Sequence, residues 1–411
     1  MQQRSYDVVL WGATGFTGRL VAAYLLRQYG LGGTLRWAIA GRSTAKLEAL
    51  RAELQTPDLP VILADSQDRA SLDRMASQTR VVCSCTGPYA LYGSELVAAC
   101  VAGGTHYCDL SGETPWMRRM IDTHHEAAQA AGVKIVHSCG FDSIPSDMGV
   151  FYLQQQALAQ YGTYCRAIHY RLRAARGGFS GGTYASLSQV LREAYTDRQV
   201  AGVLADPYAL NPPGERQGPD RPDLMGTAYD PLAGGYIGPF VMAAINTRIV
   251  RRSHALAGYP YGRDFRYDEA TYTGGGVKGR LAAGMLAAVM GLVQGAKPGT
   301  LLTRLMDRWM PKPGEGPDAR TMAQGFFKVL LYGELPDGQV LRATVTGDRD
   351  PGYGATSQMV AESAVCLAMD TLPPVSGVLT PAVAMGSVLL GRLEAYAGLR
   401  FSLDARTKAA V

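Results

Sequence analysis

The stretch Val8-Val9-Leu10-Trp11-Gly12-Ala13-Thr14-Gly15-Phe16-Thr17-Gly18 decides the fold of this chain. An apolar run ends in three glycines at intervals of three residues, and a helical pattern follows. Glycines let the backbone turn tightly and come close to a ligand, and the N–H groups that begin a helix bind phosphate. The stretch therefore predicts a strand, a turn and a helix that hold a dinucleotide over residues 7–28. A glycine turn in an α/β sheet without a ligand is the simpler alternative.

The same alternation of strand and helix continues through the first third of the chain. The strand-like runs are Asp7–Leu10, Leu35–Ala40, Val61–Ala64, Val81–Ser84, His106–Leu110 and Lys134–Ser138, and helical patterns separate them. Such a series of strands and crossovers indicates a doubly wound parallel sheet. We expect an α/β Rossmann domain over residues 1–147.

The pattern changes after Asp147. An alternating strand over Arg166–Ala174, a helix from Thr183 to about Val200 and a hairpin around Pro336-Asp337-Gly338 predict a mixed α+β domain over residues 148–350. Within it, residues 206–239 are rich in Pro and Gly, which is typical of a lid or binding loop. Residues 351–411 are expected to form a C-terminal segment with two helices, near 356–370 and 381–396.

The composition describes an ordinary globular protein. Of 411 residues, 47% are hydrophobic and 18% are charged, and the net charge is +5 without any basic run, so we expect no nucleic-acid partner. The seven cysteines are scattered without metal-ligand spacing, which favours reduced thiols and no metal. The polar start of the chain shows no signal-peptide pattern, so we expect a cytoplasmic protein. A homodimer is a further expectation.

The most hydrophobic later stretch is Leu281–Val293. Its 13 residues are short of the roughly 20 needed to span a bilayer. A buried helix is the simpler interpretation. A surface helix in contact with membrane or lipid, and a peripherally associated protein, is the alternative.

The end of the second strand distinguishes between the two nicotinamide dinucleotides. An NAD site usually has Asp or Glu there, to bind the ribose 2′-hydroxyl, whereas this chain reads Ala40-Gly41-Arg42-Ser43. A carboxylate would repel a 2′-phosphate, but Arg42 would pair with it, and Ser43 and Lys46 could add donors. NADP(H) is therefore the predicted cofactor. A solvated loop arginine is the alternative for Arg42.

Three further segments follow strands of the same sheet and are expected at the same edge of it. Asp65 could reach the adenine, or could act as a capping aspartate. Thr86-Gly87-Pro88-Tyr89 is expected to contact the cofactor through its backbone. The segment from Cys139 to Asp147 leads into the second domain, where nicotinamide and substrate should meet, and a purely structural hinge is its alternative interpretation.

Several common catalytic sets are missing from the sequence. No lysine lies four residues after a tyrosine, so the Tyr-x-x-x-Lys pair of short-chain dehydrogenases is absent. No histidine falls in a zinc pattern, and no Gly-x-Ser-x-Gly elbow indicates a hydrolase. Hydride transfer without a metal remains, with one proton donor.

Motifs along nearly the whole chain resemble a known family. The first set of motifs resembles the saccharopine dehydrogenase-like oxidoreductases: Gly12-Ala13-Thr14-Gly15-Phe16-Thr17-Gly18, Ala40-Gly41-Arg42, Thr86-Gly87-Pro88-Tyr89, Asp109-Leu110-Ser111-Gly112-Glu113 and Gly140-Phe141-Asp142-Ser143-Ile144-Pro145-Ser146-Asp147. The second set resembles the trans-acting enoyl reductase branch of this family: Ser180-Gly181-Gly182-Thr183, Asn246-Thr247-x-x-Val250-x-Arg252-Ser253, Pro313-Gly314-Glu315-Gly316-Pro317, Asp350-Pro351-Gly352-Tyr353-Gly354-Ala355-Thr356 and Gly377-Val378-Leu379-Thr380-Pro381.

The resemblance implies an NADP-linked Rossmann domain, a mixed substrate domain and C-terminal helices that return to the first domain. It also implies reduction of a carbon–carbon double bond in an acyl chain held by a carrier or a polyketide synthase, in the assembly of complex lipids. It does not imply lysine metabolism, because no set of charged ligands for an amino-dicarboxylate is recognisable in the sequence.

On this basis the cofactor is expected on the glycine turn, at Gly12, Thr14, Gly15, Phe16, Thr17 and Gly18. Ser143 and Tyr353 are the candidate proton donors, and Asp142 could orient one of them. Ser180, Gly181 and Thr183 are expected to line the acceptor, and residues 281–293 to offer an apolar surface to its acyl chain. The rival hypotheses are an NADP-binding sensor or scaffold without turnover, a peripheral lipid-surface protein, and a reductase of C=N or C=O bonds.

Overall fold

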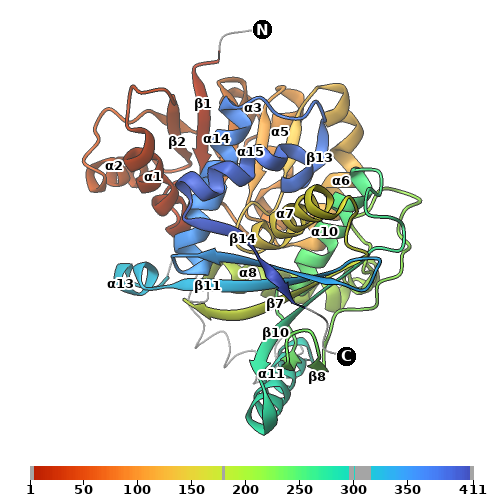
Figure 1. Ribbon diagram of the computed structural model, residues 1–411. Coiled ribbons are helices and arrows are strands. Elements are labelled where there is room, and N and C mark those ends of the chain that lie inside the picture. Colours follow the sequence, from red (N-terminus) through yellow and green to blue (C-terminus); the bar gives the residue numbers. More distant parts are fainter. Residues whose placement is uncertain (1–3, 178–180, 296–299, 301–315, 408–411) are drawn as a thin grey trace.

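Two seven-stranded sheets form the framework of the computed structural model, which describes residues 4–177, 181–295, 300 and 316–407 (Figure 1). The first sheet is parallel throughout and has the order β13-β6-β5-β4-β1-β2-β3. Its strands are β1 (Tyr6–Trp11), β2 (Trp37–Gly41), β3 (Val61–Leu63), β4 (Thr79–Ser84), β5 (His106–Asp109), β6 (Lys134–Val136) and β13 (Gly377–Leu379). The predicted doubly wound sheet is confirmed, with β13 as a strand that the sequence did not indicate.

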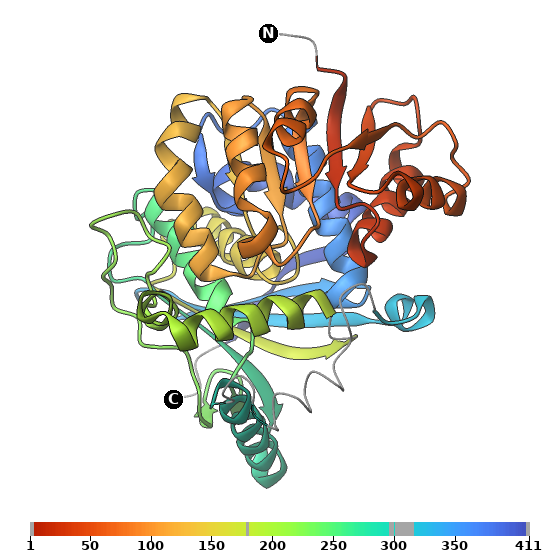
Figure 2. The same cartoon turned by 180° about the vertical axis from the view of Figure 1, so that it is seen from behind.

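Helices cover both faces of this sheet, which explains why its strands are apolar runs rather than alternating patterns. On β1, the adjacent residues Val8, Val9 and Leu10 are all fully buried. Helix α1 (Phe16–Tyr29) and α14 (Thr356–Met369) pack on one face. Helices α3 (Arg69–Ser77), α5 (Ser94–Ala102) and α6 (Thr114–Ala130) pack on the other, which faces the viewer in Figure 2.

The second sheet is mixed and has the order β14-β12-β11-β7-β10-β9-β8. Its strands are β7 (Ala167–Arg176), β8 (Ala228–Asp230), β9 (Gly235–Gly238), β10 (Arg266–Gly274), β11 (Phe326–Glu334), β12 (Val340–Gly347) and β14 (Leu399–Thr407). Only β7 and β10 pair in parallel. The predicted hairpin is the antiparallel pair β11–β12, and Gly338 in its turn has a φ of +84° that favours glycine.

The remaining helices lie between strands of one sheet or lead from one sheet to the other. They are α2 (Thr44–Glu53), α4 (Tyr89–Tyr92), α7 (Ile144–Tyr161), α8 (Gly181–Thr196), α9 (Arg198–Ala205), α10 (Ala243–Leu256), α11 (Gly276–Gly295), α13 (Ala319–Ala323) and α15 (Pro381–Tyr396), with a π-helical turn, η1 (Pro351–Ala355). Figure 2 shows α8 lying across the middle of the molecule, between the Rossmann helices and the second sheet.

Buried arginines of α10 attach residues 206–239 to the body at two points, and the predicted lid or binding loop stays a prediction. Arg251 donates to the carboxylate of Asp220 over 2.5 Å, and Arg248 pairs with Asp223. The segment also contributes β8 and β9 to the second sheet.

The C-terminal segment joins both sheets. Besides its two predicted helices, α14 and α15, it contributes β13 to the first sheet and β14 to the second. The proposed domain limits at residues 147 and 350 stay predictions.

Helix α11 contradicts the simpler interpretation of residues 281–293. Of its 20 residues, Gly279 and Ala283 are the buried ones, and Leu281 and Met285 are each 69% exposed. The prediction of a buried helix is therefore wrong, because no other layer of the described structure covers this helix.

Candidate cofactor and substrate site

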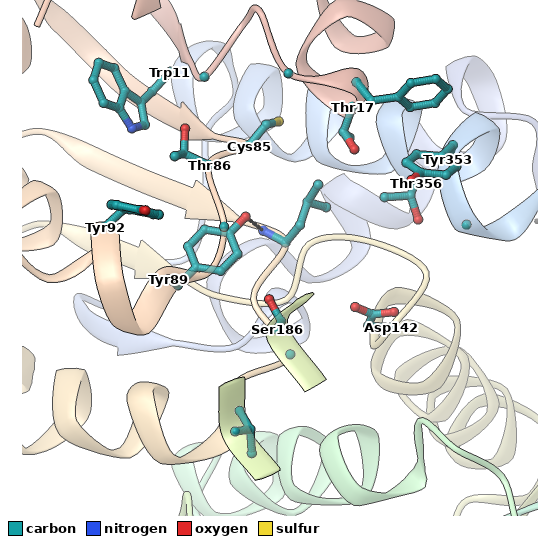
Figure 3. A pocket seen from close by; sticks show the side chains of 18 of the residues that line it. Trp11, Thr17, Cys85, Thr86, Tyr89, Tyr92, Asp142, Ser186, Tyr353 and Thr356 are labelled. Carbon is teal, nitrogen blue, oxygen red and sulfur yellow. Dashed lines mark hydrogen bonds between the residues drawn. The ribbon is translucent and has the colours of Figure 1, made fainter. Parts of the chain in front are cut away.

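A cavity of about 580 Å³ lies between the Rossmann sheet and the second domain (Figure 3). On the Rossmann side, its wall comes from the residues that follow β1, β2, β3 and β4. These are the carboxyl ends of parallel strands, where ligands of such sheets bind. On the other side, α8, α9, α10, η1 and the loop before α7 complete the wall.

The glycine turn has the shape that a pyrophosphate requires. Gly12 has a φ of +79°, and a Cβ on it would lie 2.1 Å from Oγ1 of Thr86. Gly15 precedes α1, whose first turn has no side-chain cap, so its N–H groups are directed toward the cavity wall. Thr14, Phe16 and Thr17 line the cavity as expected. The residues present therefore fit a dinucleotide.

Gly18 has a packing function instead. A Cβ on Gly18 would lie 2.2 Å from the carbonyl oxygen of Gly12, and Gly18 is not among the lining residues. This third glycine allows α1 to approach β1 closely, which is its usual function in such motifs.

The end of β2 presents two cations to the cavity. Arg42 and Lys46 both line it, and both are exposed. Ser43 does not line it, because its hydroxyl accepts a hydrogen bond of 3.4 Å from the backbone N–H of Lys46 as the N-cap of α2. Asp65 accepts from the backbone N–H of Gln67 over 3.0 Å, and its neighbour Ser66 lines the cavity in its place.

The segment after β4 forms the cavity wall through Thr86, Gly87 and Tyr89, whereas Pro88 is not among the lining residues. The Tyr89 hydroxyl donates to the Ser84 carbonyl over 3.1 Å and accepts from the Leu110 N–H over 3.1 Å. These two bonds hold the Tyr89 side chain in the wall, where Figure 3 shows it.

Glu113 connects this wall to the second domain. Its carboxylate accepts from the backbone N–H groups of Tyr89 and Ala90, both over 2.8 Å, and from the hydroxyl of Ser186 over 2.7 Å. Glu113 is 1% exposed, and burial raises the pKa of its carboxyl. Ser186 lies on α8 and lines the cavity.

Of the predicted catalytic residues, Asp142 has the surroundings that best suit proton transfer. Its carboxyl lines the cavity from the loop before α7, and Figure 3 shows it directed toward the central space. Within the described residues, this carboxyl has no ion pair. Protein surrounds it on its other sides, and this burial raises its pKa from 3.8 to about 7. At neutral pH, Asp142 can therefore hold or release a proton.

The structure separates the two predicted hydroxyl donors. Tyr353 lines the cavity, 2% exposed, with its ring centroid 4.5 Å from that of Phe16. Ser143 is fully buried outside the lining, and its hydroxyl donates to Oδ1 of Asn246 over 3.1 Å. Both catalytic assignments stay predictions.

The predicted acceptor residues fall at the edge of the described region. Ser180 lies outside the described residues. Gly181 begins α8 and Thr183 follows on it, but their side-chain surroundings also lie outside the description. Ser186, one turn later on the same helix, was not predicted, and its helical spacing from Thr183 was the signal that could have identified it.

Sequence reasoning also missed the apolar part of the cavity. Val190, Leu204, Val241, Met242, Ala244 and Ile245 line it, from α8, α9 and the start of α10. The expectation that residues 281–293 would face the acyl chain is wrong, because α11 contributes no lining residue. The remaining lining residues that were not predicted are Trp11, Gly41, Cys85, Tyr92, Leu110, Gly112, Thr114, Gly352 and Thr356.

Comparisons with known proteins agree with this geometry. Residues 8–136 match the family model of the saccharopine dehydrogenase NADP-binding domain. The chain therefore carries an NADP-binding domain, and the cofactor predicted from Arg42 is confirmed. An apo saccharopine dehydrogenase from Saccharomyces cerevisiae aligns over 97% of this chain and 100% of its own, with a TM-score of 0.48 and 14% identity, which is too distant for any conclusion.

Curated relatives match over almost the full length. A Mycobacterium tuberculosis protein, whose name places it among the trans-acting enoyl reductases, is 42% identical over 95% of this chain and 96% of its own. Trans-acting enoyl reductases of Mycobacterium bovis and Mycobacterium leprae are 40% and 38% identical, with the same coverage. This chain is therefore an NADP-dependent oxidoreductase that belongs to the trans-acting enoyl reductase family.

Proposed function

We propose that this enzyme reduces the carbon–carbon double bond of an enoyl thioester, on an acyl chain destined for a complex lipid. The observation that carries the proposal is the charge distribution of the cavity. Its only lining cations among the described residues are Arg42 and Lys46, both at the cofactor end. Among the described residues, the opposite end is lined mainly by apolar side chains together with Asp142 and Ser186, and it has no cation that would pair with the carboxylates of an amino acid.

When bound, NADPH supplies a hydride for the β-carbon of the enoyl group. Arg42 and Lys46 would hold its 2′-phosphate, and the N-terminus of α1 would hold its pyrophosphate. Val190, Leu204 and Met242 exclude water from the acyl side. The protonated carboxyl of Asp142 delivers a proton to the α-carbon, so that the C=C bond becomes a C–C single bond.

The acyl chain is presented by a partner in this proposal. A carrier protein or a polyketide synthase holds the thioester, which agrees with the names of the relatives. We also propose that the enzyme contacts a lipid surface and that it is cytoplasmic. The homodimer stays a prediction.

The test is NADPH consumption with three matched sets of acceptors: 2-enoyl thioesters, 3-oxo thioesters and cyclic imines, each with short and long alkyl chains. We expect turnover with the enoyl thioesters, and a kcat/KM that rises with chain length, because each methylene buried in the apolar wall contributes about 0.8 kcal/mol. Consumption with oxo or imine acceptors alone, or with none of the three sets, would overturn the proposal.

A further inference from the structure

Helix α11 stands away from the body of the protein, at the bottom of Figures 1 and 2. Its first part is attached to the second sheet, and near its end Gln294 donates to the sulfur of Met225 over 3.7 Å. The Thr273 hydroxyl donates to the carbonyl of Gly279 over 2.9 Å, and a Cβ on Gly238 would lie 3.2 Å from the carbonyl oxygen of Ala283. From residue 284 onward, no residue of α11 is buried.

The large apolar side chains that α11 exposes form one stripe. Val277, Leu281, Met285, Val289 and Leu292 are 75%, 69%, 69%, 50% and 62% exposed. Their spacings of three and four residues place them within about 120° of the helix circumference. They make up five of the sixteen large apolar side chains that are exposed in the described residues. Such a concentration marks a surface that binds something apolar.

The charges of α11 indicate which apolar partner it binds. The helix contains no acidic residue, and its two charged residues, Lys278 and Arg280, are exposed cations near its start. Cations beside an apolar stripe are typical of helices that lie in the surface layer of an anionic membrane. Long cationic side chains can reach lipid headgroups while their stems stay in apolar surroundings.

The length of α11 also suits a bilayer. Its 20 residues span about 30 Å, the thickness of a hydrocarbon core, and its most apolar 18-residue window has a mean hydropathy of 1.4. However, β10 before it and β11 after it belong to the same sheet, so both ends of this excursion lie on one side. A single crossing is therefore unsuitable, and insertion from one side is favoured.

We propose that α11 is a membrane anchor, which inserts its apolar stripe into one leaflet of an anionic bilayer and holds Lys278 and Arg280 at the phosphate headgroups. The proposal goes beyond the reduction reaction and does not depend on which bond is reduced. It would hold the enzyme at the lipid surface into which acylated products partition.

The test is flotation of the full-length protein with vesicles of phosphatidylglycerol and phosphatidylcholine. The variant L281Q/M285Q removes apolar area from exposed positions on a helix, and Gln is a good helix former, so the fold should be kept. The matched control, L158Q/M369Q, makes the same two chemical changes at exposed positions on α7 and α14. We expect wild type and control to float, and L281Q/M285Q to bind at least tenfold less.

A second variant tests the role of charge. K278Q/R280Q should bind anionic vesicles less than wild type does, and should show no difference on pure phosphatidylcholine. The proposal is overturned if wild type does not float, or if L281Q/M285Q floats as well as its control. It is also overturned if L281Q/M285Q changes the oligomeric state in gel filtration without changing flotation, because a second copy would then be the partner of the stripe. Flotation involves no turnover, so its failure is separate from failure of the proposed reaction.

Discussion

At the scale of single residues, Arg42 is the residue whose meaning was clearest from the sequence. It comes directly after β2, where NAD-binding sites usually have a carboxylate. It lines the cavity together with Lys46. A guanidinium can bind a phosphate through two parallel hydrogen bonds, and such charge-assisted bonds are about twice as strong as neutral ones.

Replacing Arg42 by alanine should weaken NADPH binding more than NADH binding. A lost hydrogen bond between charged groups costs about 1.5–3 kcal/mol, so we expect the Kd of NADPH to rise on the order of tenfold to a hundredfold. The Kd of NADH should change by less than about threefold, because NADH has no 2′-phosphate. Titration of both cofactors by fluorescence measures this, and equal losses for both would exclude the assigned role.

Asp142 differs from most aspartates because its surroundings favour the protonated form. Its folded-state pKa of about 7 lies above the value of 3.8 in an unfolded chain. The free energy of unfolding therefore falls as the pH rises between these two pKa values. In the folded protein, the protonated acid is the main form only below about pH 7.

The rate of reduction should follow this titration. In wild type, kcat/KM should fall as the pH rises above about 7, because the proton donor is lost. In Asp142→Asn, kcat should fall about a hundredfold, and this limb of the profile should disappear. A rate within threefold of wild type, with an unchanged pH profile, would show that another group donates the proton.

Asp147 provides the matched control for this experiment. Burial raises its pKa to about 7 as well, but its carboxylate accepts from the Ser253 hydroxyl and from the Ala382 N–H over 2.8 Å, outside the cavity lining. Asp147→Asn should lower the thermal stability and keep the pH limb of kcat/KM. The two variants thus separate proton delivery from the general effect of a buried carboxyl.

At the scale of elements, Glu113 links two parts of the cavity wall. Its carboxylate, just before α6, holds the N-terminus of α4 through two backbone N–H groups and holds α8 through Ser186. It is a positioning residue, because it is not itself among the lining residues. The cofactor wall and the substrate wall therefore share one buried acceptor.

Glu113→Gln should disturb both walls, whereas Ser186→Ala should disturb one. In Glu113→Gln, an amide replaces one accepting oxygen, which leaves a buried N–H unpaired and lowers the free energy of unfolding by about 2 kcal/mol. We expect the KM of both NADPH and the acyl substrate to rise. In Ser186→Ala, only the acyl KM should rise, and thermal melts should change little. Identical kinetic patterns in the two variants would contradict this division.

Elements differed in how well the sequence predicted them. The strands of the first sheet other than β13, and the β11–β12 hairpin, were predicted, because buried parallel strands are continuous apolar runs and turns contain Gly and Pro. Strands β13 and β14 were missed. Strand β13 is a short run that joins the sheet from far along the chain. Strand β14 alternates Leu399, Phe401 and Leu403 with polar residues, which is a strand signal that was overlooked. Helix α11 was predicted as a helix, but its apolar composition is the same for a buried core and for a membrane surface.

At the scale of the whole molecule, one hydrophobic core joins the two sheets. It extends from Val8 in the first sheet to Phe327 in the second. Beside it, Glu362 on α14 accepts from the Tyr24 and Tyr29 hydroxyls of α1 over 2.7 Å and 2.6 Å, and pairs with Arg392 of α15. The C-terminal segment therefore holds helix α1 of the Rossmann sheet in place.

The sequence by itself determined the parallel sheet, the glycine turn and the choice of NADP, because these depend on local patterns and on the charge of a few adjacent residues. Only the tertiary structure decided which side chains meet across the cavity. Ser186 and Ile245 lie far along the chain from Gly12, and nothing in a linear pattern states that they line one space. The exposure of α11 was likewise decided by the tertiary structure, since burial depends on what the rest of the chain leaves uncovered.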